Sequence, residues 1–114
     1  MRKKIYLCHP YGRRRGAGKG ECSYNAMLSI NWGRKLIEKG FNPYIANLGH
    51  FVHVGWDKSP SEDVYFELVS AWIKDCDAVF VAKLPDHEDS GVHMEIKIAE
   101  ALGISVYYNI EDIK

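Results

Sequence analysis

Short apolar segments alternate along the sequence with longer segments of helical periodicity, and this pattern limits the fold more than any other feature. The short segments carry apolar side chains at successive positions, as strands do when helices cover both faces of a sheet. They span residues 5–8, 43–46, 78–82 and 104–108. Strands that alternate with helices favour a parallel sheet with right-handed crossovers. We therefore predict an α/β fold.

Three segments between these strands have the apolar spacing of amphipathic helices. In the first, Gly40 is expected to end the helix, and the expected buried stripe is Ala26, Ile30, Gly33 and Ile37. In the second, Ser59 to Glu62 form a capping box with Pro60 at the first helical position, before the stripe Tyr65, Leu68, Val69 and Trp72. The third is expected to begin at Ser90 and Gly91, to end at Gly103 and to bury Val92, Ile96, Ala99 and Leu102.

Length and composition then set the class of protein. A chain of 114 residues is one small domain with one core, so residues 1–114 are predicted to form a single Rossmann-like (flavodoxin-like) three-layer domain with a four- or five-stranded parallel sheet. A formal net charge of zero gives no support for a nucleic-acid polymer as a partner. No apolar run is long enough to span a membrane, and the basic start is not followed by the apolar region of a signal peptide. We expect a cytoplasmic protein with no membrane partner.

Ligands of parallel α/β sheets bind beyond the carboxyl ends of the strands. In this sequence the loops expected there are residues 9–21, 47–58 and 83–90, and the first two are long for such connections. The first loop places Arg13, Arg14, Arg15 and Lys19 among Gly12, Gly16, Gly18 and Gly20. Glycines let backbone N–H groups approach an anion, so the loop is a candidate phosphate cradle. It matches neither the P-loop nor the dinucleotide motif, and a solvated basic loop is the alternative.

Glu95 breaks the pattern of the third helix. The polar residues His93, Lys97 and Glu100 share one face, and Glu95 projects on the opposite side, among the apolar residues. It either bends toward solvent, meets a buried cation, or is an ionised carboxylate in a partly dry cleft, where it acts as a nucleophile or general base. Asp89, as a second acid or hydrogen-bond partner, and Tyr6, which supplies a phenol, are the catalytic candidates beside it. Two carboxylates and a phenol suit chemistry through an oxocarbenium-like transition state.

The remaining candidate residues give weaker signals. The five histidines show no recognised metal-ligand spacing, so we expect neither a metal nor a cofactor. The stretch Gly49-His50-Phe51 is expected to line the cleft. Phe51, Trp56 and Tyr11 are candidates to stack on a base, with core packing as the alternative. Three cysteines without a Cys-x-x-Cys motif are expected to be reduced packing residues.

At these residues the sequence resembles the nucleoside 2-deoxyribosyltransferases and the related 2'-deoxynucleoside 5'-phosphate N-hydrolases. The resemblance covers most of the chain, from KIYLCHPYG through a helix with an early Asn25 to GFNPYIANLGHF, WIKDCDAVFVAKLPD and EDSGVHMEIKIAEALGISVYY. The last stretch is the most specific, because an acid or serine, a glycine and a glutamate at the head of a helix form the family's signature. The resemblance implies cleavage or transfer at an N-glycosidic bond through a covalent glycosyl-glutamate.

Residue by residue, the resemblance implies that Glu95 is the nucleophile that attacks C1' of the sugar and that Tyr6 orients it. Asp89 occupies a position that is aspartate in the transferases and serine in the hydrolases. The substrate is a nucleoside or nucleoside 5'-monophosphate, and the residues expected to contact it are Tyr11, Gly12, Arg13, Arg14, Arg15, Gly16, Gly18, Lys19, His50, Phe51, Ser90 and Gly91.

The sequence also departs from the family. Val69 lines up with a ligand-binding aspartate of the second major helix, and the chain ends at Lys114, before the segment from which relatives lend a residue to a partner subunit. A non-catalytic nucleotide-binding or sensing module of the same fold therefore stays open as the alternative function.

A homodimer or higher homo-oligomer is expected. A small α/β domain has limited apolar area to bury internally, and the chain carries three tryptophans and seven tyrosines, residue types that are enriched in interfaces. Trp32, Tyr65 and Trp72 are the aromatic residues expected between subunits. The alternative is that they pack against the domain's own loops.

Overall fold

A parallel sheet forms the centre of the protein. The computed structural model describes residues 2–12, 18–53, 55–58, 61–85 and 91–114. In these residues a four-stranded sheet has the order β2-β1-β3-β4, and every neighbouring pair is parallel. The strands are β1 (Lys4–Cys8), β2 (Asn42–Ile45), β3 (Ala78–Val81) and β4 (Ser105–Tyr107). The predicted α/β fold is confirmed.

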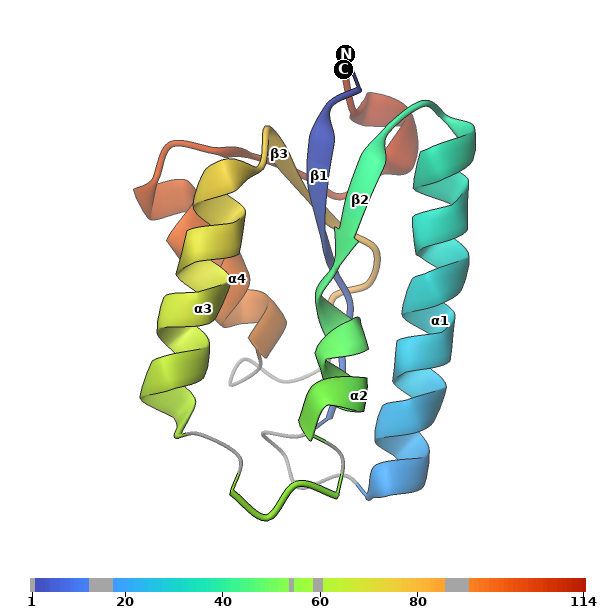
Figure 1. Ribbon diagram of the computed structural model, residues 1–114. Coiled ribbons are helices and arrows are strands. Elements are labelled where there is room, and N and C mark those ends of the chain that lie inside the picture. Colours follow the sequence, from blue (N-terminus) through green and yellow to red (C-terminus); the bar gives the residue numbers. More distant parts are fainter. Residues whose placement is uncertain (1, 13–17, 54, 59–60, 86–90) are drawn as a thin grey trace.

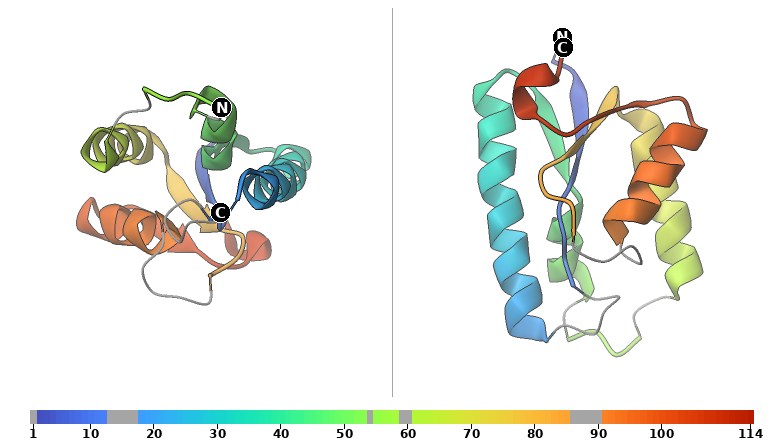
Figure 2. Two further views of the ribbon diagram at one scale, coloured as in Figure 1. Left: turned by 90° about the horizontal axis from the view of Figure 1, so that it is seen from below. Right: turned by 180° about the vertical axis from the view of Figure 1, so that it is seen from behind.

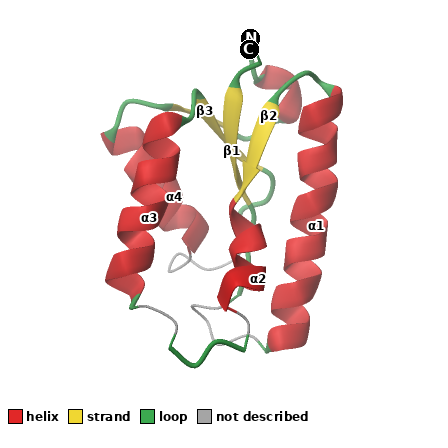
Figure 3. Cartoon of the chain, in the orientation of Figure 1, coloured by secondary structure: helices red, strands yellow, loops and turns green. Residues whose placement is uncertain are grey.

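Helices cover both faces of this sheet, which gives three layers (Figures 1 and 2). Helix α1 (Lys19–Glu38) and the 3-10 turn η2 (Ile110–Asp112) pack on one face, and helices α3 (Glu62–Asp75) and α4 (Gly91–Ala101) pack on the other. The 3-10 turn η1 (Ala46–Gly49) and the short helix α2 (His50–His53) follow β2. Residues 47–58, expected to be a loop, are therefore partly helical (Figure 3).

Alternation along the strands divides the core into two parts. Tyr6 and Cys8 of β1 point to the side of α3 and α4, whereas Ile5 and Leu7 point to the side of α1. All four are buried, with Val79 and Val81 of β3 joining the first cluster and Ala78 and Phe80 joining the second. The central strands thus bury side chains on both faces, as their apolar sequences predict.

The buried face of α1 differs from the predicted stripe. Ala26 and Gly33 are buried as expected, but Ile37 is 52% exposed and the neighbouring Leu36 is fully buried. Compared with the prediction, α1 is turned about its axis so that Leu36, and not Ile37, packs in the core against β1. Gly33 lies against β2, where an added Cβ would stand 2.4 Å from Ile45 Cδ1. Helix packing against a specific strand therefore decides which of two adjacent apolar residues is buried.

The start of α3 and part of its buried face differ from the prediction. Its N-cap is Ser61, whose side chain makes no cap hydrogen bond, and the helix begins at Glu62, so Pro60 is not its first residue. Of the predicted stripe, Val69 packs against the core and Tyr65 is half-buried. Leu68 and Trp72 are 45% and 46% exposed, and the fully buried residue is Ile73. Because α3 packs against both the sheet and α4, its inner face is turned away from Leu68.

Helix α4 agrees with its prediction except at its C-terminal end. It begins at Gly91 and buries Val92, Ile96 and Ala99, but Leu102 lies beyond the last helical turn and is 44% exposed. Gly103, with φ of 72°, ends the helix as predicted, because its left-handed backbone lets Ile104 N–H reach the carbonyl of Ala99. Gly40, with φ of 95°, ends α1 in the same way.

Candidate functional site

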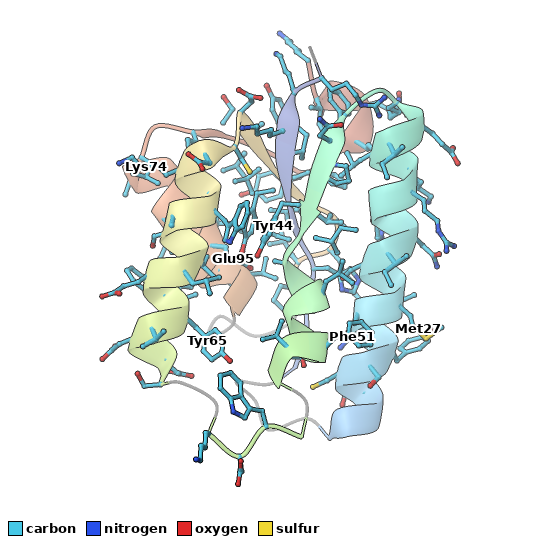
Figure 4. All side chains as sticks on the ribbon, in the orientation of Figure 1. Met27, Tyr44, Phe51, Tyr65, Lys74 and Glu95 are labelled. Carbon is cyan, nitrogen blue, oxygen red and sulfur yellow. The ribbon has the colours of Figure 1, made fainter. Side chains whose placement is uncertain are left out.

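Glu95 lies in the second turn of α4 and points into the protein (Figure 4). Its side chain is buried, with 7% of the residue exposed. The phenol of Tyr6, 89 residues earlier in the chain, donates a hydrogen bond to Glu95 Oε2. The predicted neighbourhood of Tyr6 and Glu95 is therefore present, and Glu95 does not bend toward solvent.

Cys8 lies on the same side of the sheet as Glu95. Strand alternation puts its side chain on the same face of β1 as Tyr6, where it packs in the apolar cluster with Val92, Ile96 and Ala99 of α4. From the sequence, Cys8 is expected only to pack in the core. Cys8 is two residues from Tyr6 on a strand, and this spacing places both side chains on one face of the sheet.

The pKa of Glu95 is shifted by these surroundings. Burial raises the pKa of Glu95 to about 7, and the hydrogen bond from Tyr6, together with the nearby Cys8 thiol, opposes that rise. Burial, followed by the charge of Glu95, raises the pKa of Tyr6 and of Cys8 well above their ordinary values. Near neutral pH the phenol and thiol therefore keep their protons, while Glu95 exchanges between its carboxylic acid and carboxylate forms.

Stacked aromatic rings from two further elements extend from Tyr6. Tyr44 of β2, paired in register with Tyr6, stacks on it with ring centroids 5.4 Å apart. Trp72 of α3 stacks on the other side, 4.4 Å from Tyr44 at an interplanar angle of 15°. Burial and then the charge of Glu95 raise the pKa of Tyr44. Tyr44 is not predicted from the sequence as part of this site, because its position beside Tyr6 follows from the strand register.

The chain that leaves β1 is held by two asparagines. Asn47 is buried, and its Nδ2 donates to the carbonyl of His9 at 3.1 Å, to that of Pro10 at 3.2 Å and to Ser29 Oγ at 2.8 Å. Asn25 Nδ2 donates to the carbonyl of Tyr11 at 2.9 Å. Residues 9–11, which lead into the basic glycine loop, are thereby fixed to α1 and η1.

Replacing Asn47 with alanine is expected to lower the free energy of unfolding by about 1–3 kcal/mol, because buried carbonyl and hydroxyl partners lose their donor. Asn31 is an exposed asparagine of α1 and provides the matched control, for which we expect a change within about 0.5 kcal/mol. Urea unfolding followed by circular dichroism measures both. Equal stability of the Asn47→Ala protein and the wild type would show that this network does not hold the loop.

His9 directly follows β1 and is one of the five histidines considered as metal ligands. Burial, followed by the charge of Lys83, lowers the pKa of His9. The hydrogen bond between His9 Nδ1 and the carbonyl of Pro10, 2.8 Å long, acts in the opposite direction. His9 is therefore neutral at pH 7. Among the residues that the structure describes, no group of three or more His, Cys, Asp or Glu side chains is arranged to hold a metal ion.

The structure places some of the predicted substrate-contacting residues and not others. Tyr11 and Gly12 are half-buried directly after β1, Gly18 is the N-cap of α1, and Gly91 begins α4. Phe51 is 62% exposed and lies on the side of α2 that faces α1, away from Glu95 (Figure 4). The predicted residues outside the described part are Arg13, Arg14, Arg15, Gly16, Asp89 and Ser90, together with the side chains of Lys19 and His50.

A search of protein-family models finds no match to this chain, and no curated protein matches it significantly. Within the described residues, none of the helices has both the length and the apolar character needed to cross a membrane.

Proposed function

We propose that the protein cleaves or transfers the N-glycosidic bond of a nucleoside or nucleoside 5'-monophosphate, with Glu95 as the nucleophile. The observation that carries this proposal is the buried pair of Glu95 and Tyr6, in which a carboxylate on an otherwise apolar helix face accepts a hydrogen bond from the central strand. A carboxylate with a fixed orientation and a pKa near 7 is suited to attack an electrophilic sugar carbon near neutral pH.

In the proposed reaction, one oxygen of Glu95 forms a bond to C1' of the sugar as the bond from C1' to the base nitrogen breaks. The base leaves with the electron pair of that bond and takes up a proton. Water or a second base then attacks C1' of the glycosyl ester and releases the Glu95 carboxylate. Positive charge develops on the sugar ring in both steps, and the nearby carboxylate stabilises it.

A panel of ribo- and deoxyribonucleosides and their 5'-monophosphates tests this function. Each compound is incubated with the protein at pH 8, where Glu95 is mostly ionised, and free base is measured by chromatography. Release of base from at least one compound is expected, and a second base added to the mixture separates transfer from hydrolysis. Absence of base release and of exchange across the panel would contradict the proposal.

The basic loop supports 5'-monophosphates as the substrates. Arg13 to Arg15 carry three positive charges close to four glycines in sequence, a composition that suits phosphate binding. Asp89 would oppose a phosphate. Comparison of matched nucleoside and monophosphate pairs in the panel, at low and high salt, gives the net sign of these two contributions, since salt weakens both charge interactions: a preference for the monophosphate that fades with added salt means that the basic loop dominates.

A non-catalytic nucleotide-binding module is the second candidate, and Val69 favours it. Val69 stands where the resembling family has a ligand-binding aspartate, and here it packs against the apolar cluster around Tyr6 and Ile73. Calorimetry with the same panel identifies this case, because a binding module would give binding heat with a nucleotide and no free base.

We also propose that the protein forms a homo-oligomer through α3. Val64, Leu68 and Trp72 recur along one side of this helix and are 45%, 45% and 46% exposed. Trp32, expected in the interface, instead packs edge-on against Phe80 of its own domain.

We further propose a cytoplasmic location, which the three free and buried cysteines support, because reduced thiols are typical of that compartment.

Replacing Leu68 with glutamate is expected to shift the protein from dimer to monomer, because a charge would be buried at the centre of the α3 stripe. Met27 of α1 is 61% exposed and points away from the body of the molecule, so Met27→Glu is the matched control (Figure 4). Sedimentation over a hundredfold dilution measures the mass of each protein. Wild-type protein of one-chain mass at every concentration would contradict the interface.

A further inference from the structure

Tyr44 lies between two aromatic rings that come from different elements. On one side it stacks on Tyr6, its partner in strand register, with ring centroids 5.4 Å apart at an interplanar angle of 29°. On the other side it stacks on Trp72 of α3, with ring centroids 4.4 Å apart. Tyr44 packs in the same apolar cluster as Tyr6, on the side of the sheet on which Glu95 lies (Figure 4). Three stacked rings therefore connect the hydrogen bond on Glu95 to α3.

The stack restricts the motion that would displace the Tyr6 hydroxyl. The oxygen of a phenol lies on the long axis of the ring, so a ring flip leaves it in place, and a swing about the Cα–Cβ bond moves it. A second ring stacked on one face of the phenol opposes such a swing. We propose that Tyr44 is a positioning residue whose ring, braced by Trp72, holds the Tyr6 phenol against the Glu95 carboxylate and so keeps that carboxylate in its reactive orientation.

The neighbour of Tyr6 on the opposite side of β1 has no ring. Val79 of β3 is paired in register with Tyr6 there, and both residues are fully buried. A short branched side chain fills space, but it presents no flat surface for a phenol to stack on. Trp72 in turn restricts Tyr44, because their two rings are nearly parallel, at an interplanar angle of 15°. The ring of Tyr44 is therefore the part that acts on Tyr6, and its hydroxyl is dispensable for this role.

Carbon-13 NMR of protein labelled at the glutamate carboxyl carbon measures this role without a substrate, and the Glu95 signal is identified by its absence in Glu95→Gln. Burial raises the pKa values of the other titratable side chains that act on the site, which are Tyr6, Cys8, Tyr44 and Cys76. These groups keep their protons, so a midpoint near pH 7 belongs to Glu95. Tyr6→Phe should raise the midpoint by roughly 1 pH unit, because the carboxylate loses a hydrogen bond. Tyr44→Leu should raise it by roughly 0.5 unit, and Tyr44→Phe, which keeps the ring, should leave it unchanged.

A double-mutant cycle separates positioning from a general change in packing. If Tyr44 acts through the Tyr6 hydroxyl, Tyr44→Leu should have no further effect on the midpoint in the Tyr6→Phe background. Water that enters after Tyr44→Leu would instead lower the midpoint in both backgrounds, because it would solvate the charge. Tyr107 of β4 is a half-buried tyrosine on the other face of the sheet, so Tyr107→Leu is the matched control and should not shift the midpoint.

An unchanged or lowered midpoint in Tyr44→Leu would overturn the role of Tyr44. The same is true of an equal shift in Tyr44→Phe, in Tyr107→Leu or in both backgrounds of the cycle. If Tyr44→Leu does not fold, Trp72→Leu, which removes the outer ring of the stack, should still raise the midpoint, and the absence of a rise would overturn the role. If Tyr6→Phe does not fold, the comparison of Tyr44→Leu with Tyr44→Phe decides alone.

The catalytic part of the inference rests on the proposed function. A raised midpoint in Tyr44→Leu without base release by the wild type would reject the proposed function alone. With base release, kcat of Tyr44→Leu should fall roughly 10-fold or more with little change in KM, and phenylalanine at the same position should restore it. An unchanged kcat in Tyr44→Leu would show that the ring does not position the reacting carboxylate.

Discussion

Glu95→Gln is expected to abolish base release, with a loss of rate of roughly 10³-fold or more. The amide has nearly the same size and can still accept a hydrogen bond from Tyr6, but its oxygen is a far weaker nucleophile than a carboxylate. Glu100 is an exposed glutamate of the same helix, and Glu100→Gln is the matched control, for which near-normal turnover is expected. Initial rates of base release at pH 8 measure both.

Folding and ligand binding must be measured on the same samples. Circular dichroism of Glu95→Gln should match the wild type, and calorimetry should show that the substrate identified in the panel still binds. Near-normal turnover by the folded Glu95→Gln protein would mean that the covalent mechanism is wrong.

The second large effect is on the pH dependence of stability. The pKa of Glu95 is about 7 in the folded protein, compared with an ordinary value of 4.5, so between these values the folded state binds more protons than the unfolded state. The contribution of Glu95 to stability is therefore fully present below about pH 4.5 and is lost as the pH rises through 7. A shift of this size corresponds to about 3 kcal/mol.

Glu95→Gln cannot ionise and should lose this dependence. Urea unfolding of both proteins between pH 5 and pH 8.5 gives the difference in their free energies of unfolding. We expect the wild type to lose about 2.5 kcal/mol relative to the variant as the pH rises over this range, since the remainder of the effect is already lost below pH 5. A constant difference would show that Glu95 ionises as an exposed carboxyl group does.

The sequence predicted the fold and the centre of the site for identifiable reasons. Apolar residues at successive strand positions required a sheet covered on both faces, which the structure confirms for β1 and β3. Helical periodicity alone placed Glu95 on the buried face of α4, where it lies. The resemblance of IYLC and GVHMEI to a known family placed Tyr6 beside it, and the hydrogen bond between the two is present.

Other features depend on packing that periodicity does not determine. On α1, Leu36 and Ile37 are adjacent and equally apolar, and only the rotation of the helix against the sheet buries Leu36. On α3, contact with α4 turns Ile73 inward and leaves Leu68 partly exposed. Tyr44 stacks on Tyr6 because β2 pairs with β1 in that register, and sequence patterns do not fix the register of two distant strands.

Trapping the covalent intermediate tests the central role of Glu95 most directly. An analogue of the preferred substrate with fluorine at C2' slows breakdown of the glycosyl ester, because fluorine destabilises positive charge at the neighbouring C1'. After incubation and acid quenching, peptide mapping by mass spectrometry should find the sugar bound to Glu95 in the wild type and no adduct in Glu95→Gln. Base release from the analogue with an adduct on another residue, or with no adduct at any time, would contradict the account.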